Sequence, residues 1–177
     1  MDRIEIRLSG SGGQGLILAG IILAEAAILD GKNSVQTQSY GPEARGGASR
    51  AEVIISNGNI DYPKVTEPDI FLALTKEAVA KYLGDVKKGG KLIIDDSIEL
   101  NDFILEDLKL YQIPIIKTAR EKVGNEIAAN IVALGAITGI TEIVSQESII
   151  KAVLDRVPAE TIELNNKALH EGFKLIK

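Results

Sequence analysis

The sequence contains no cysteine in its 177 residues. Without thiols, this chain cannot form disulfides, ligate an iron–sulfur cluster through thiolates or use a cysteine nucleophile. It has a single histidine, His170, and no group of acidic or histidine residues at the spacing of metal ligands. We therefore expect no metal site built by this chain.

An excess of positive charge and long apolar runs are also missing. The 20 basic residues are scattered and are outnumbered by 25 acidic residues, so the net charge is -5, which argues against nucleic-acid binding. The apolar runs are too short or too interrupted to span a bilayer, and the first residues lack the pattern of a signal peptide. We expect a cytoplasmic protein with neither nucleic acid nor membrane as a partner.

The chain is rich in glycine where a strand runs into a helix. Apolar residues alternate in the stretch that begins at Arg3, and glycine then occupies positions 10, 12, 13 and 15 before an apolar helix over 16–29. Glycines permit positive φ and let a ligand approach the backbone, while the amides that begin the helix attract an anion such as a phosphate. We expect Gly10, Gly12, Gly13, Gln14 and Gly15 to form a cofactor-binding loop.

Two checks count against the standard nucleotide sites. The second strand of a dinucleotide fold would end in an acidic residue, but the segment 34–39 has none. A P-loop would close with Gly-Lys-Ser/Thr, whereas here Gly15 stands between Gln14 and Leu16. A glycine turn that only lets helix and strand pack closely therefore stays open as the alternative.

The remaining pattern predicts a three-layer α/β sandwich with a mostly parallel, mixed sheet, a Rossmann-like first unit and a helical C-terminal third. We expect one domain over residues 1–177, in which the first two strands are parallel neighbours. The third strand follows the second after about ten residues, too few for a parallel crossover, so this pair should be antiparallel.

The expected elements have these bounds. Further strands are expected at 35–39, 50–56, 70–74, 91–95 and 113–117, with a short edge segment at 60–63. Further helices are expected at 76–83, 101–110, 126–138, 146–157 and 160–176. The apolar segment 127–140 either covers the sheet or forms a subunit interface, which would make the isolated chain a homodimer.

A second glycine-rich loop follows the second strand, at the same sheet edge as the first. Its candidate partner- or ligand-facing residues are Tyr40, Gly41, Pro42, Glu43, Arg45, Gly46 and Gly47. Arg45, together with Arg50, could contact an anion opposite the first loop, because guanidinium groups bind carboxylates and phosphates in a forked geometry. The alternative is that Glu43 and Arg45 are solvated loop charges.

Together, GSGGQG at 10–15 and YGPEARGG at 40–47 resemble the gamma subunit of the 2-oxoacid:ferredoxin (acceptor) oxidoreductases, in particular the 2-oxoglutarate type. The resemblance implies an assembly that oxidatively decarboxylates a 2-oxoacid with coenzyme A to acyl-CoA, CO2 and reduced ferredoxin. It implies that thiamine diphosphate, Mg and the iron–sulfur clusters belong to alpha, beta and, in some members, delta chains. This chain would then act only as a subunit, with no catalytic residue of its own.

Two other functional classes stay open. One is a free-standing enzyme that binds a phosphate-containing cofactor at the first loop, and the other is a purely structural assembly subunit. Asp95-Asp96 at a strand end and His170 in the last helix are weaker candidates, for a cation and for a titrating group, because each lacks partner residues in the sequence. The sequence does not rank 2-oxoglutarate above other 2-oxoacids.

Overall fold

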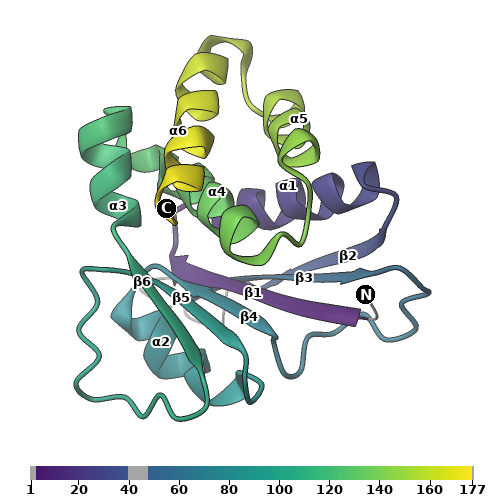
Figure 1. Cartoon of the computed structure of the whole chain (residues 1–177), viewed down its shortest axis with the longest axis vertical. Coiled ribbons are helices and arrows are strands. Elements are labelled where there is room, and N and C mark those ends of the chain that lie inside the picture. Colours follow the sequence, from purple (N-terminus) through teal and green to yellow (C-terminus); the bar gives the residue numbers. More distant parts are fainter. Residues whose placement is uncertain (1–2, 40–47, 177) are drawn as a thin grey trace.

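A six-stranded mixed sheet forms the centre of the molecule (Figure 1). The computed structural model describes residues 3–39 and 48–176. The strands are β1 (Arg3–Ser11), β2 (Asn33–Ser39), β3 (Ala48–Ser56), β4 (Ile70–Ala73), β5 (Lys91–Asp95) and β6 (Lys109–Ile113). The helices are α1 (Leu16–Leu29), α2 (Lys76–Tyr82), α3 (Ile115–Thr118), α4 (Ala129–Thr141), α5 (Gln146–Arg156) and α6 (Ile162–Lys174). Short 3-10 or π turns are η1 (Leu83–Asp85), η2 (Ala119–Val123), η3 (Glu126–Ala128) and η4 (Ala159–Thr161).

The strand order is β2-β3-β1-β4-β5-β6. The antiparallel pairing of β2 with β3 confirms the prediction from the short connection, and β1, β4, β5 and β6 run parallel. The prediction that β1 and β2 are neighbours is wrong, because β3 inserts between them and pairs antiparallel with both. β3 is buried along nearly its whole length, as expected for a strand inside a sheet that is covered on both faces, whereas the polar β2 remains at the edge.

Helices cover both faces of the sheet, as the predicted three-layer sandwich requires. In Figure 1, α1, α4, α5 and α6 lie above the sheet and α2 lies below it. The upper core joins sheet residues such as Leu8 and Leu72 to α1 and α4, and the lower core joins Phe71 and Leu92 to α2. The segment 131–138 of α4 is buried within this chain, so this helix serves as a cover of the sheet.

Two predicted elements between β5 and α4 are wrong. Residues 101–108 form turns instead of a helix, and Asp107 has a positive φ of 62° that a helix does not permit. The last strand lies at Lys109–Ile113, and the segment predicted as a strand at 113–117 is mostly α3. A short apolar run has no periodicity that separates a strand from a buried helical turn, and Pro114 ends the strand within it. The predicted edge segment at 60–63 forms no strand either.

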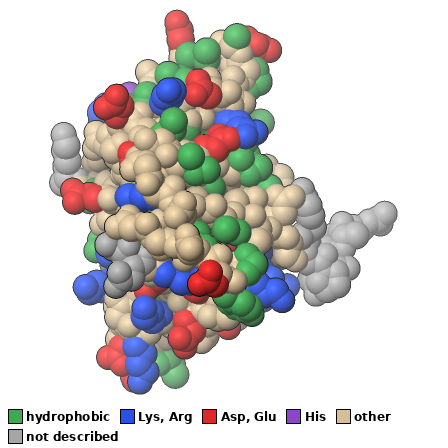
Figure 2. Space-filling view, turned by 90° about the vertical axis from the view of Figure 1, so that its right-hand side faces the viewer, with side chains coloured by type: hydrophobic (Ala, Val, Ile, Leu, Met, Phe, Trp, Pro, Cys, Tyr) green, Lys and Arg blue, Asp and Glu red, His purple; other side chains and the backbone are tan. Residues whose placement is uncertain are grey.

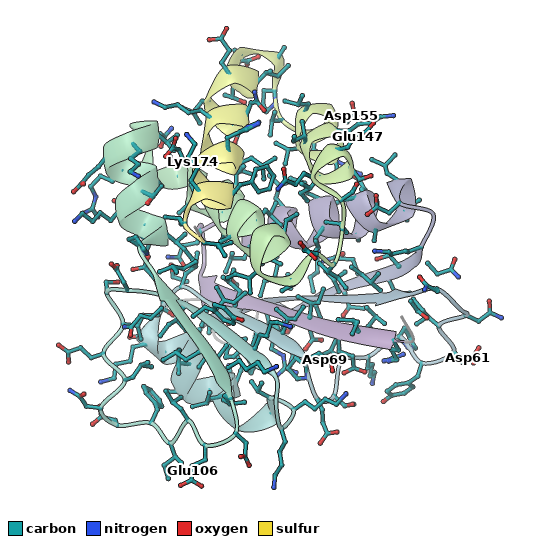
Figure 3. The ribbon with its side chains drawn as sticks, in the orientation of Figure 1. Asp61, Asp69, Glu106, Glu147, Asp155 and Lys174 are labelled. Atoms are coloured by element: carbon teal, nitrogen blue, oxygen red, sulfur yellow. The ribbon has the colours of Figure 1, made fainter. Side chains whose placement is uncertain are left out.

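On the face shown in Figure 2, Lys and Arg side chains alternate with Asp and Glu side chains. Figure 3 shows charged residues at widely separated places, for example Glu106 below the sheet and Asp155 on α5. Within the described ranges, no helix is both long and apolar enough to cross a bilayer.

Candidate functional site

The glycine loop joins the carboxyl end of β1 to the start of α1. Gly13 and Gly15 have φ values of 88° and 70°, which a side chain would strain. Gly15 is the N-cap of α1, and no side chain caps this helix end. The first turn of α1 also lacks an acidic residue, so the positive end of its dipole is not neutralised by the helix itself.

The other loop residues divide into two groups. Gln14 Oε1 accepts a hydrogen bond from Ser11 N at 2.8 Å, and this carboxamide occupies the space that a Cβ at Gly10 would need. Gly10 and Gln14 therefore shape the loop. Gly12 and Gly13 are exposed, and a Cβ at either would meet no atom within 4 Å, so the backbone there is open to a binding partner.

Asn130 in the first turn of α4 is a part of this site that the sequence did not reveal. Its side chain is buried and donates from Nδ2 to the carbonyl of Gly15 at 3.1 Å. A Cβ at Gly15 would lie 2.5 Å from that nitrogen. Asparagine inside an otherwise apolar helical segment was the available signal, but its partner lies 115 residues away in the chain.

A cleft of about 310 Å³ opens beside the loop. Its lining residues are Gly13, Gln14, Ile116, Glu126, Ile127 and Ala129. Asp95 at the end of β5 fixes one wall, because its Oδ2 accepts from Ile116 N at 2.7 Å and its Oδ1 accepts from Ser97 N at 3.1 Å. The buried carboxylate of Asp95 thus caps α3. Among the described residues, no group of three or more His, Cys, Asp or Glu side chains could hold a metal ion.

The second predicted loop, Tyr40 to Gly47, lies outside the described residues. The start of β3 that follows it is nevertheless tied to the first loop. Ser49 Oγ donates to the carbonyl of Gly10 at 3.2 Å, and Ser9 Oγ donates to the carbonyl of Ser49 at 2.8 Å. The chain therefore leaves the second loop directly beside the glycine loop.

Two other sequence candidates are engaged elsewhere. Arg50 lies on the face covered by α2, with Nε 3.6 Å from Glu52 Oε1 and its guanidinium carbon 5.5 Å from the Tyr82 ring centroid. Exposed His170 has Nδ1 2.8 Å from the carbonyl oxygen of Asn166 and packs edge-on against Phe173. Neither residue contacts the glycine loop in a hydrogen bond or ion pair of the described structure.

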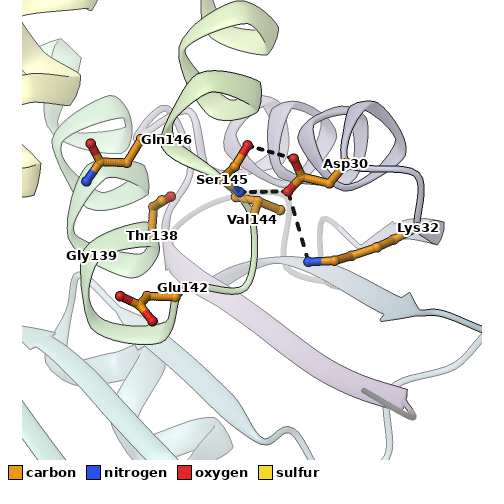
Figure 4. A pocket seen from close by; sticks show the side chains of 8 residues that line it. All are labelled: Asp30, Lys32, Thr138, Gly139, Glu142, Val144, Ser145 and Gln146. Atoms are coloured by element: carbon orange, nitrogen blue, oxygen red, sulfur yellow. Dashed lines mark hydrogen bonds and ion pairs between the residues drawn. The ribbon is translucent and has the colours of Figure 1, made fainter.

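A separate polar cavity of about 540 Å³ lies at the other end of α1 (Figure 4). There, Asp30 Oδ2 accepts from Ser145 N, and Oδ1 accepts from the hydroxyls of Ser145 and Ser148, each at 2.6 Å. Burial raises the pKa of Asp30, but the hydrogen bonds from Ser145 and Ser148 and the charge of Lys32 outweigh it and hold the pKa below its ordinary value. This network joins α1 to α5 and serves the fold.

Comparison with known protein families assigns the chain to one of them. The sequence model of the family described as pyruvate ferredoxin/flavodoxin oxidoreductase matches residues 5–175. The chain therefore belongs to this family of oxidoreductases, which confirms the resemblance drawn from the two loop motifs.

Individual proteins similar to this chain are more specific than the family as a whole. The chain is 52% identical over 177 residues to 2-oxoglutarate synthase subunit KorC of Methanocaldococcus jannaschii, covering 99% of this chain and 95% of that protein. The structure matches the gamma subunit of a keto/oxoacid ferredoxin oxidoreductase from Geobacter sulfurreducens PCA with a TM-score of 0.90 and 53% identity, covering 99% of this chain and 97% of that one.

A third match is a larger chain. It belongs to a 2-oxoglutarate:ferredoxin oxidoreductase from Magnetococcus marinus, solved with 2-oxoglutarate, coenzyme A and succinyl-CoA bound. The TM-score is 0.86 at 25% identity, and the match covers 99% of this chain but 31% of that one. The same fold therefore occurs there within a longer polypeptide.

Proposed function

We propose that this chain is the gamma subunit of a 2-oxoglutarate:ferredoxin oxidoreductase. The complex would convert 2-oxoglutarate, coenzyme A and two oxidised ferredoxins to succinyl-CoA, CO2, two reduced ferredoxins and a proton. The observation that carries the proposal is the 52% identity to a 2-oxoglutarate synthase subunit along nearly the whole of both chains. The high structural similarity to a separately solved gamma subunit supports it.

In this proposal the reactive groups belong to partner chains. The alpha and beta subunits, with a delta subunit in some assemblies, would hold thiamine diphosphate, Mg and the iron–sulfur clusters, and ferredoxin would accept the electrons. This chain's residues do not suit a thiolate-held cluster, because it has no cysteine. Its one domain, residues 1–177, would contribute binding surface instead of reacting groups.

The substrate is tested by purifying the complex that contains this chain and measuring reduction of a viologen dye. We expect the rate with 2-oxoglutarate to exceed the rates with pyruvate and branched-chain 2-oxoacids by at least about tenfold, roughly 1.4 kcal/mol of transition-state discrimination. The rate should also require coenzyme A. A complex that prefers pyruvate would contradict the substrate but leave the subunit assignment intact.

We also propose that the glycine loop binds an anionic group, and the phosphates of coenzyme A are our candidate. The support is the uncapped start of α1 and the open backbone of Gly12 and Gly13. Gly10, Gln14 and Gly15 would hold the loop in shape, and residues 40–47 would face the ligand or a partner chain. The alternative is that the glycine loop only lets β1 and α1 pack closely against each other, a role that requires no ligand.

Gly12→Asp distinguishes these two roles. A Cβ at this position would meet no atom within 4 Å, so the new side chain should leave the fold intact while its carboxylate repels an anion near the loop. We expect the KM for coenzyme A to rise about fivefold to tenfold in the complex, with little change in kcat. Gly12→Asn is the matched neutral control and should change the KM less than about twofold. Equal effects of the two variants would favour the packing turn.

A further inference from the structure

The turn after β3 contains the one place in the chain where glycine directly follows asparagine, Asn57-Gly58. Both residues are exposed, and they come directly after Ser56, the last residue of β3. Ser56 pairs with Arg3 at the start of β1, whereas the glycine loop follows the end of β1. The turn therefore lies at the opposite edge of the sheet from the glycine loop, and its chemistry is independent of the proposed function.

The contacts of this turn leave the asparagine side chain and the next backbone nitrogen close to each other and lightly held. Among the described residues, the carboxamide of Asn57 makes no hydrogen bond. Gly58 N lies outside the ladder of the sheet and donates to Ser56 Oγ at 3.0 Å. A Cβ at Gly58 would come no closer than 3.9 Å to that hydroxyl, so the space around the Gly58 backbone is open.

We infer that Asn57 is a site of spontaneous deamidation and that the Ser56 hydroxyl restrains the reaction by holding the Gly58 N–H. After this nitrogen loses its proton to a base in the solvent, it forms a bond to Cγ of Asn57. The bond from Cγ to Nδ2 then breaks, and ammonia leaves with a proton taken from water. Water opens the resulting five-membered succinimide at either carbonyl carbon and leaves aspartate or isoaspartate. The reaction takes up water and releases ammonia, and it needs neither an oxidant nor a reductant.

Glycine after the asparagine is what makes the ring closure accessible. It has no Cβ to hinder the approach of the two groups, and its backbone reaches conformations that other residues avoid. Asn59 in the same turn is also exposed and makes no side-chain hydrogen bond within the described ranges, but the β-branched residue Ile60 follows it. Asn59 is therefore an internal control that differs from Asn57 mainly in the next residue.

The pair Asp30-Gly31 shows how the same ring closure is blocked by structure. Hydrogen bonds at the start of α5 hold the Asp30 carboxylate, and Gly31 N donates to the carbonyl of Ile28 at 2.9 Å. Neither the side chain nor the backbone nitrogen can approach the other without losing these bonds. In the part of the chain that the structure describes, the Asn57 side chain has no such anchor.

The test incubates the folded full chain in mildly alkaline buffer and follows each asparagine by mass spectrometry of peptides, with the digestion done in acid. We expect Asn57 to convert at least about tenfold faster than Asn59, because only Asn57 precedes a glycine. Gly58→Ala should slow the conversion of Asn57 at least about fivefold. Gly58 has no positive φ and room for a Cβ, so this variant should keep the wild-type thermal midpoint.

Ser56→Ala tests the restraint on the Gly58 nitrogen. Removing the hydroxyl frees the N–H, so we expect the conversion of Asn57 to become about twofold to tenfold faster, the factor that corresponds to one hydrogen bond. Conversion of Asn57 no faster than that of Asn59, or unchanged by Gly58→Ala, would overturn the site. A wild-type rate in Ser56→Ala would overturn the restraint. A failure of the proposed function would appear elsewhere, as a complex without 2-oxoglutarate activity.

Discussion

At the scale of single residues, Gly15 is a position in the glycine loop where both the backbone conformation and a buried neighbour disfavour a side chain. It combines a φ of 70° with contact to the buried side chain of Asn130. Alanine in the left-handed region costs about 1–2 kcal/mol, and the contact with Asn130 adds to it. We expect Gly15→Ala to lower the free energy of unfolding by about 2–3 kcal/mol in urea titration.

Gly12→Ala is the control for this prediction. Gly12 has no positive φ and open space around its Cα, so the free energy of unfolding should change by less than about 0.5 kcal/mol. If both alanine variants destabilised the chain equally, glycine content alone would explain the result and the specific contact with Asn130 would not.

Asp30 gives a prediction on pH. Because its pKa is lower in the folded chain than the unfolded value of about 3.9, its stabilising effect is complete above that value and is lost as pH falls through the folded pKa. We expect Asp30→Asn to lower the free energy of unfolding by about 1–2 kcal/mol at pH 7. The difference from wild type should shrink below about pH 4.

Asp155→Asn on α5 is the matched control for the pH series. Among the described residues, the side chain of Asp155 makes no hydrogen bond or ion pair, so the substitution should have little effect at any pH. A difference between Asp30→Asn and wild type that stays constant down to pH 2 would contradict the role of the Asp30 charge.

At the residue level, the sequence allowed correct predictions of features that depend only on the local backbone conformation. Glycines at 13 and 15 do adopt the positive φ that a strand-to-helix loop requires. The shaping role of Gln14 and the link from Asn130 to Gly15 were not foreseen, because they depend on which side chain fills the space beside a glycine. Such contacts over long separations in the chain follow from tertiary packing and not from local pattern.

At the scale of elements, α4 and α6 cross in close contact through glycines. A Cβ at Gly135 would collide with the carbonyl of Leu169, and a Cβ at Gly172 would collide with the carbonyl of Val132. Alanine favours an isolated helix over glycine by about 1 kcal/mol, but here the backbones would have to separate. We expect Gly135→Ala and Gly172→Ala each to destabilise the chain by about 2–3 kcal/mol in urea titration.

Gly139→Ala on the same helix separates close backbone contact from glycine content. Its Cβ would meet the end of the Ile176 side chain at 2.6 Å, and that side chain can rotate away. We expect a change below about 1 kcal/mol. A stabilising Gly135→Ala would show that α4 and α6 adjust freely and would contradict the rigid crossing.

Helices and strands whose apolar residues recur with a clear period were predictable from the sequence. Segments without such a period were not. The strands β1, β3, β4 and β5 and the helices α1, α2, α5 and α6 lie near their expected positions. The region from 101 to 118 was assigned wrongly, because its apolar residues show no clear period and the capping of α3 by Asp95 comes from another strand. The insertion of β3 between β1 and β2 likewise depends on pairing across the whole sheet.

At the scale of the whole molecule, the central claim is that this chain works only as one subunit of a larger oxidoreductase. The claim fits a single sheet-and-helix unit that matches an isolated gamma subunit and also one third of a longer chain. It also agrees with a sequence that has no cysteine for a redox cluster. The sequence predicted this role through its two loop motifs.

The most direct measurement is gel filtration of gently prepared extract from the native cells. The chain is followed by mass spectrometry and each fraction is assayed for viologen reduction that depends on 2-oxoglutarate and coenzyme A. We predict one peak that contains this chain, thiamine- and cluster-carrying chains and the activity. A chain that elutes alone, with the activity in other fractions, would contradict the account.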